Sequence, residues 1–163
     1  YFANITADCP MIDPVLVDRA VIEYQKTDAD LQKFDDSFVD LPFNCYLIKV
    51  SALEKVCRLK KETDTEVWLK YFTSNPEMNV RSIIVEDEYR HKKLKTSLDY
   101  PEDYEFIKCV FAELYMSDTV FSMQDIINLV KRRPELLNIN ANPSLLGRWR
   151  KHQQAINQVD AKL

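Results

Sequence analysis

The chain has 163 residues, a hydrophobic content of 46% and a formal net charge of −4. This length is enough to bury one sizeable core, so we expect a single domain over residues 1–163. The acidic balance argues against nucleic acid as the main partner, because phosphate backbones are bound by concentrated basic surfaces. No apolar run is long enough to span a membrane and the first residues lack the features of a signal peptide, so we expect a cytoplasmic protein with no membrane partner.

The cysteine and glycine content indicates the redox state of the protein and excludes one type of phosphate-binding loop from these residues. The cysteines at positions 9, 45, 57 and 109 form no C-x-x-C pair, which is typical of a reduced cytosolic protein. The single glycine, Gly147, contrasts with the roughly eleven that average usage of about 7% would give. A glycine-rich phosphate loop is therefore absent from these residues, and we expect any nucleotide-binding loop to precede Tyr1.

The chain begins YFANITADCPMIDP. Residues 1–7 predict a short buried strand, and a helix is expected from Pro14 to about Lys26. Asp8 then lies just beyond a strand, at the edge where open α/β sheets bind ligands. Because an aspartate between a strand and a helix is often a turn or capping residue, both interpretations stay open. We expect Asp13 to be a helix-start acid.

The middle of the chain alternates between predicted strands and helices. The acidic stretch from Asp28 to Asp40 predicts a solvated connection. Residues 45–50, CYLIKV, predict a strand, and Ser51 with Glu54 has the spacing of a capping box at the start of the next helix.

A further helix is expected in TDTEVWLKYFTSNPE, ending near Asn75 because the residue before a proline disfavours helix. Its aromatic residues, Trp68, Tyr71 and Phe72, have the spacing of a buried helix face, although such rings also stack on bases or sugars.

A second aspartate, Asp99, is predicted to follow directly after a strand. Residues 80–86 predict a strand, residues 87–93 a charged loop and residues 94–98 another strand, with Asp99 at its end. Pro101 is then expected as the first residue of a helix, with Asp103 as a helix-start acid. This helix carries Tyr104, Ile107, Phe111 and Leu114 at helical spacing.

The remaining residues predict helices. Ser122 is expected to cap a short helix that ends before Pro134, and its basic end, residues 131–133, suits a helix carboxyl terminus. Residues 141–163 predict a basic helical tail in which Trp149 either packs on the core or anchors a partner chain. Alternating strands and helices indicate the α/β class.

Asp8 and Asp99 each follow a predicted strand and precede a helix that begins with proline. Both can therefore open onto the same crevice at the strand ends. Magnesium takes one or two carboxylates and completes its octahedron with waters and substrate phosphates, as phosphoryl or nucleotidyl transfer requires. Cys9 lies beside Asp8, but with no histidine near it in sequence we expect an inert thiol.

Three segments, ITADCPMIDPVLVD, TSLDYPEDYEFIK and FSMQDIINLVKRRPELLNIN, resemble the carboxyl-terminal half of the cytidylyltransferases that activate acidic sugars. The resemblance points to the spore-coat polysaccharide biosynthesis branch, which is related to acylneuraminate and 3-deoxy-manno-octulosonate cytidylyltransferases. In that family one strand ends in a D-x-P-L-I-D-P-like motif and a later strand in a D-x-P-E-D motif. The match runs from about Phe2 to Asn140.

The resemblance implies a Rossmann-like nucleotide-diphospho-sugar transferase fold, truncated here at its amino-terminal side. It implies a transferase of CMP from CTP to an acidic sugar of the acylneuraminate or nonulosonate type, with release of pyrophosphate. Asp8 and Asp99 would be the catalytic residues that hold Mg²⁺ against the α-phosphate of CTP and the incoming sugar. The anomeric hydroxyl of the sugar would attack that phosphorus without a protein nucleophile.

The sequence also departs from the family pattern. The family's glycine-rich loop with arginine and lysine is absent, so we expect the 163-residue chain alone to be inactive. Relatives carry an R-E-H-V-T-like segment where this chain has residues 64–68, DTEVW, which removes expected sugar contacts. Two alternatives stay open: a non-catalytic interaction or regulatory domain with this fold, and a transferase that uses another nucleotide. A homodimer is compatible with each of them.

Overall fold

The computed structural model describes residues 1–35, 45–61, 68–91, 93–141, 144, 147–148 and 151. Among these residues, no helix is long and apolar enough to cross a membrane. Residues 64–67, most of the predicted basic tail and Trp149 lie outside the described residues.

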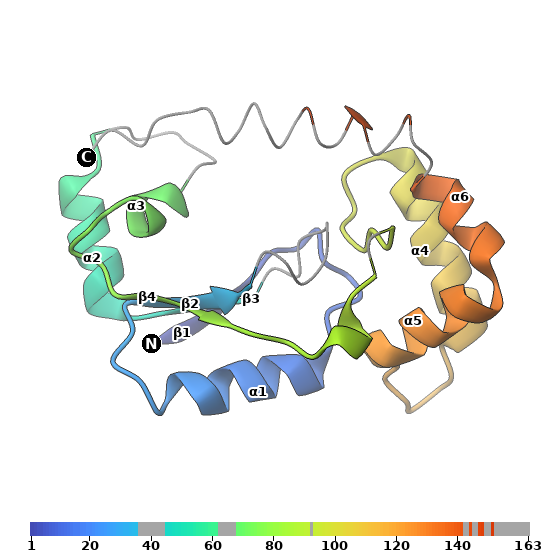
Figure 1. Ribbon diagram of the computed structural model, residues 1–163, viewed down its shortest axis with the longest axis horizontal. Coiled ribbons are helices and arrows are strands. Elements are labelled where there is room, and N and C mark those ends of the chain that lie inside the picture. Colours follow the sequence, from blue (N-terminus) through green and yellow to red (C-terminus); the bar gives the residue numbers. More distant parts are fainter. Residues whose placement is uncertain are drawn as a thin grey trace.

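A mixed sheet of four strands forms the centre of the fold, in the order β1-β3-β2-β4 (Figure 1). The strands are β1 (Phe2–Ile5), β2 (Leu31–Phe34), β3 (Cys45–Ile48) and β4 (Val80–Ile83). β3 runs antiparallel to both β1 and β2, whereas β2 and β4 are parallel. β1, β2 and β4 therefore point the same way, toward the helices at the right of Figure 1.

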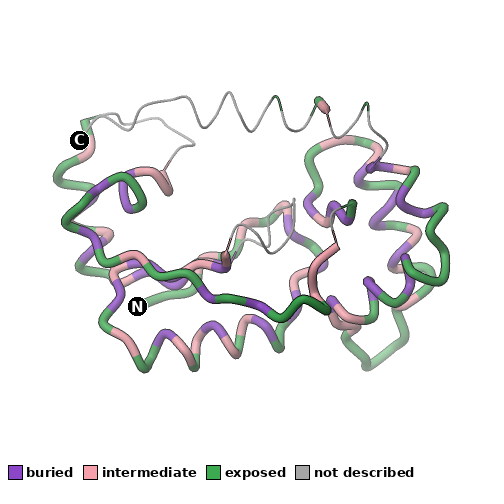
Figure 2. The backbone as a smooth tube through the Cα atoms, in the orientation of Figure 1, coloured by how far each residue is buried: buried purple, intermediate pink, exposed green. Residues whose placement is uncertain are grey.

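Helices cover both faces of this sheet. α1 (Pro14–Tyr24) packs on one face, and α2 (Val50–Leu59) with α3 (Lys70–Thr73) packs on the other. Successive residues of a strand point to opposite faces. Leu47 accordingly belongs to the core with α1, while its neighbour Ile48 belongs to the core with α2 and α3. Figure 2 shows buried positions recurring along α1, as an amphipathic helix requires.

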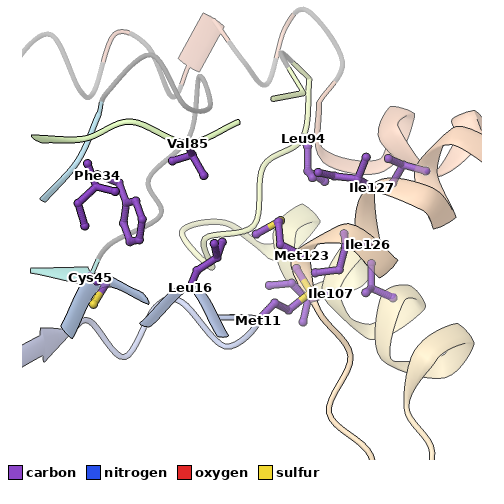
Figure 3. Close-up of a cluster of buried hydrophobic side chains, with 14 of the residues drawn as sticks. Met11, Leu16, Phe34, Cys45, Val85, Leu94, Ile107, Met123, Ile126 and Ile127 are labelled. Carbon is purple, nitrogen blue, oxygen red and sulfur yellow. The ribbon is translucent and has the colours of Figure 1, made fainter. Parts of the chain in front are cut away.

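A second group of helices lies beyond the carboxyl ends of β2 and β4 (Figure 1). It consists of α4 (Pro101–Leu114), α5 (Met123–Arg132) and α6 (Leu137–Asn140), with 3₁₀ turns η1 (Asp87–Tyr89) and η2 (Pro134–Leu136). Its apolar side chains are continuous with the core under α1. Figure 3 shows Met11, Ile107 and Met123 gathered at this junction.

The solvated connection predicted from Asp28 to Asp40 is wrong over residues 31–34, which form β2, while residues 36–40 of that prediction lie outside the described residues. β2 is a central strand, paired with β3 on one side and β4 on the other, and Leu31 and Phe34 are buried on opposite faces. Gln32, also buried, donates from Nε2 to the carbonyl of Ala20 at 2.9 Å. A strand of only four residues, flanked by acidic residues, is too short to show the hydrophobic alternation by which strands are recognised in sequence.

The strand predicted over residues 1–7 is present, but it is not buried. β1 forms one edge of the sheet, and Phe2 and Ile5 remain 37% and 40% exposed. An apolar β-branched run predicts a strand, but not whether that strand lies at the centre or the edge.

Helix starts were predicted well where a proline or a capping side chain marks them. α1 and α4 begin at Pro14 and Pro101, and Ser122 caps α5. The capping box predicted at Ser51 is wrong, because α2 begins at Val50 without a side-chain cap.

Aromatic burial matches the predicted core on α3. Tyr71 and Phe72 are buried, and Trp68 meets the Tyr46 ring edge-on at 5.0 Å, so this cluster belongs to the core. On α4, Phe106 and Ile107 are buried, whereas Tyr104 is 54% exposed.

The cysteines differ in accessibility, which gives a direct test of this packing. Cys57 is exposed, whereas burial raises the pKa of Cys45 to about 11. At pH 8 only about one Cys45 in a thousand is then a thiolate, the reactive form. In a titration with an aromatic disulfide reagent we expect Cys57 to react faster than the half-buried Cys109, and Cys45 to react slowly. Fast labelling of Cys45 itself, identified by peptide mass, would contradict the packing around β3.

Candidate functional site

Asp8 lies in a turn just after β1. The turn is closed by the Cys9 amide, which donates to the Thr6 carbonyl at 3.1 Å. The buried Cys9 thiol is 3.7 Å from Oδ1 of Asp8 and 3.5 Å from the Thr6 hydroxyl. Through these contacts the Cys9 thiol packs within the turn.

Asp99 follows an irregular segment with a bend at Ser97, not the strand predicted over residues 94–98. No ladder forms there among the described residues, because the backbone groups have other partners. The Leu94 amide donates to the His91 carbonyl at 3.0 Å, and the Lys95 carbonyl accepts from Nδ2 of Asn140 at 3.1 Å. The prediction of a strand was therefore wrong, whereas the helix after Asp99 is correct.

One backbone hydrogen bond joins the two predicted site segments. The Leu98 amide donates to the Asp8 carbonyl at 2.7 Å, so the residue before Asp99 lies directly against Asp8. The segments are 90 residues apart in sequence, and this contact places both aspartates on adjoining stretches of backbone. Asp8 is half-buried and the Asp99 side chain is 32% exposed, so both remain within reach of solvent.

A buried lysine holds the Asp99 carboxylate. Oδ2 of Asp99 lies 2.6 Å from Nζ of Lys95 and accepts from the Ser97 hydroxyl at 2.7 Å. The Lys95 side chain is only 2% exposed. Lysine is rarely buried without a charged partner, so this ion pair is a specific feature of the site.

Asp103 anchors the same lysine from the first turn of α4. Its Oδ2 accepts from the amides of Asp99 and Tyr100 at 3.0 and 2.9 Å and pairs with Nζ of Lys95. Its Oδ1 accepts from Nδ2 of Asn140 at 3.0 Å. Asp103 is thus the predicted helix-start acid, and it also links α4 to α6. We call Lys95, Asp99, Asp103 and Asn140 the Lys95 network.

Asp13 is likewise a helix-start acid. Oδ1 accepts from the amides of Val15 and Leu16 at 2.8 and 3.3 Å, and Oδ2 accepts from the Met123 amide at 2.8 Å. The carboxylate is buried and bridges the starts of α1 and α5. Asp13 therefore has a structural role, because both of its carboxylate oxygens are bonded to backbone amides.

A magnesium site at Asp8 and Asp99 would need ligands from outside the protein. Among the described residues there is no group of three or more His, Cys, Asp or Glu side chains able to hold a metal ion. A dedicated protein cage is therefore not present in that part of the chain. Magnesium needs only one or two carboxylates when waters and substrate phosphates supply the rest, which is the role expected of Asp8 and Asp99 from the sequence.

Sequence reasoning missed the residues around Asp99. Lys95 was not recognised because its burial depends on Asp103 and Asn140, which lie on α4 and α6. Arg148 was noticed only as part of a basic tail. Its guanidinium lies 4.2 Å from the Tyr100 ring centroid and 3.1 Å from Glu102, beside the start of α4.

The other basic cluster serves a helix end, as predicted. Lys131 and Arg132 occupy the last turn of α5. Arg133 pairs with Glu113 and with Glu135, and the hydrogen bond that Arg133 donates to Glu135 is the main cause that raises the pKa of Arg133. These contacts support α5 and give no indication of phosphate binding.

Comparison with known proteins shows what fold carries this site. The sequence matches no protein-family model and no curated protein. A solved cytidylyltransferase from Leptospira borgpetersenii serovar Hardjo-bovis (strain JB197) is similar in structure, with a TM-score of 0.69 at 20% identity. The match covers 83% of this chain and 57% of that one, so this chain spans little more than half the length of that protein. The chain therefore has an α/β fold of the Rossmann-like type shared with this cytidylyltransferase.

Proposed function

We propose that the chain is the carboxyl-terminal half of a cytoplasmic nucleotidyltransferase. It transfers CMP from CTP to an acidic sugar of the acylneuraminate or nonulosonate class, for polysaccharide biosynthesis. The observation that carries the proposal is the hydrogen bond from the Leu98 amide to the Asp8 carbonyl. It brings together the two segments whose motifs resemble the cytidylyltransferases, on a fold that such an enzyme shares.

Asp8 and Asp99 are assigned to the transfer step. Their carboxylates would hold Mg²⁺, which neutralises charge on phosphoryl oxygens and lowers the pKa of a bound hydroxyl. The anomeric hydroxyl of the sugar forms the new bond to the α-phosphorus, the bond to the β-phosphate oxygen breaks, and pyrophosphate leaves. The hydroxyl proton passes to solvent. Within the chain, Lys95 and Ser97 orient the Asp99 carboxylate through its Oδ2 atom.

Pyrophosphate release tests the reaction. The assay uses the longest natural reading frame that contains these 163 residues, with each nucleoside triphosphate in turn. The sugars are an acylneuraminate, 3-deoxy-manno-octulosonate and, as a neutral control, N-acetylglucosamine. We expect release only with CTP and an acidic sugar, its loss on chelation of divalent cations and its recovery with added Mg²⁺. Turnover with another nucleoside triphosphate would show that CTP is not the nucleotide substrate. No turnover with any of them would contradict the proposed nucleotidyl transfer.

The 163-residue chain by itself is expected to release no pyrophosphate. Its only glycine, Gly147, lies far from the candidate site in sequence, and its net charge of −4 adds no affinity for a triphosphate. The same assay, run beside the longest reading frame, measures this difference. Robust turnover by the 163-residue chain would contradict the requirement for a further nucleotide-binding loop.

One observation favours the alternative of a non-catalytic interaction or regulatory domain. The Asp99 carboxylate is already paired with the ammonium of Lys95, 2.6 Å away, and such a pair is sufficient as a structural element. An inactive longest reading frame whose fold is intact by circular dichroism would support this alternative.

A further inference from the structure

Lys95 is a buried cation whose hydrogen-bonding capacity is used within the protein. Its ammonium lies 2.9 Å from the Ser97 carbonyl, 2.6 Å from Oδ2 of Asp99 and in close contact with Oδ2 of Asp103. The ammonium donates to the Ser97 carbonyl and to Oδ2 of Asp103, and it forms an ion pair with Oδ2 of Asp99. Because the Lys95 side chain is only 2% exposed, its effect on a ligand passes mainly through these carboxylates.

The charges of the Lys95 network do not cancel. One ammonium faces two carboxylates, so the network has an excess of one negative charge when both acids are ionised. Asp103 is fully buried and has three further hydrogen bonds from the protein. Asp99 is the more exposed of the two acids, so it is the one that a cation from solvent can reach.

A divalent cation at Asp99 would lie close to the ammonium of Lys95. Two like charges a few ångströms apart repel strongly when one of them is buried. The ammonium also fixes the carboxylate, because it bonds the same Oδ2 atom that accepts from Ser97. Lys95 thus orders Asp99 and weakens its attraction for a second cation.

We propose that Lys95 is a positioning residue that holds the Asp99 carboxylate and, as a resident cation, keeps the affinity of Asp99 for divalent cations low until a polyphosphate ligand adds negative charge. The inference rests on the metal role proposed for Asp99. If Lys95 acts in this way, the divalent cation binds together with the nucleotide and not before it, because the triphosphate supplies the negative charge that offsets Lys95.

A matched pair of variants isolates the ammonium. Removing Lys95 alone would strand the buried charge of Asp103, which is strongly destabilising. Asp103→Asn and the double variant Lys95→Met/Asp103→Asn both lack that charge and differ only in the cation beside Asp99. Lys49→Met is the control for overall charge, because Lys49 is an exposed lysine paired with Asp28, away from the site.

The readout is Mn²⁺ affinity in the 163-residue chain without nucleotide, followed by paramagnetic broadening of the Asp99 amide signal. We expect the double variant to bind Mn²⁺ about tenfold more tightly than Asp103→Asn, while Lys49→Met matches the unmodified chain. A lysine with a merely structural role would loosen the site when removed, not tighten it. Equal or weaker binding in the double variant, or no broadening at Asp99, overturns the inference.

The unmodified chain gives a second measurement that needs no variant to fold. The buried Lys95 ammonium should give a slowly exchanging ¹H–¹⁵N signal, and added Mg²⁺ should shift it with the same midpoint as the Asp99 amide. Saturation of Asp99 without a shift at Lys95 overturns the inference. If Asp99→Asn abolishes pyrophosphate release but the matched variants bind Mn²⁺ equally, only the role of Lys95 fails; full activity in Asp99→Asn overturns the metal role itself.

Discussion

Replacing Asp99 with Asn in the longest natural reading frame is expected to lower CTP-dependent pyrophosphate release at least about 100-fold. The amide keeps the size of the side chain but removes the negative charge that a hard divalent cation requires. Stability should change little, because Lys95 keeps Asp103 and the Ser97 carbonyl as partners. With the Asp99 side chain 32% exposed, we expect a loss of about 1 kcal/mol in the free energy of unfolding.

The control for this variant is Asp87→Asn. Asp87 is an exposed acid that pairs with Arg90 three residues away, in the 3₁₀ turn η1. The Asp87→Asn variant has the same chemical change outside the candidate site. Its rate of pyrophosphate release and its melting temperature should therefore stay close to those of the unmodified protein. Near-normal release by Asp99→Asn at ordinary magnesium concentration would show that Asp99 is a turn residue and not a metal ligand.

Replacing Asp13 with Ala should have the opposite pattern, with a large effect on stability. The buried carboxylate accepts from three backbone amides, those of Val15, Leu16 and Met123. Alanine leaves these donors without that acceptor and breaks the link between α1 and α5. We expect the free energy of unfolding to fall by about 3 kcal/mol, measured by urea denaturation. The melting temperature should fall by roughly 10 °C.

Asp125→Ala is the matched control for Asp13→Ala. Asp125 also lies at a helix start, where its Oδ2 accepts from the amide and the hydroxyl of Ser122 at 2.8 and 2.7 Å. Its side chain is exposed, so water can replace those contacts and the loss should be about 1 kcal/mol. Equal losses in the two variants would mean that the contact with Met123 adds nothing to stability.

Helix starts could be predicted from the sequence because they depend on neighbouring residues. Pro14 with Asp13, Pro101 with Asp103, and Ser122 with Asp125 each satisfy local rules for proline position and capping. Such rules act within one turn, so a single sequence reveals them. The same rules failed at Ser51, where the chain passes from β3 into α2 two residues earlier without a capping side chain.

Pairing across the fold could not be predicted in the same way. β2 is flanked by acids and is recognisable only because β3 and β4 lie on either side of it. Residues 94–98 have strand-like composition, but their polar groups bond to Asp8 and Asn140 instead of a neighbouring strand. Lys95 is buried by contacts with Asp103 and Asn140, on α4 and α6, which no local pattern specifies.

The most direct test of the central claim is whether Asp8 and Asp99 hold the same cation. Mn²⁺ is titrated into the longest natural reading frame with CTP present, and the broadening of individual backbone amide signals is followed. The account predicts that the Asp8 and Asp99 signals broaden together with one midpoint, and that Asp8→Asn and Asp99→Asn each remove both effects. Broadening that survives either substitution, or that is centred elsewhere in the chain, would contradict a shared metal site.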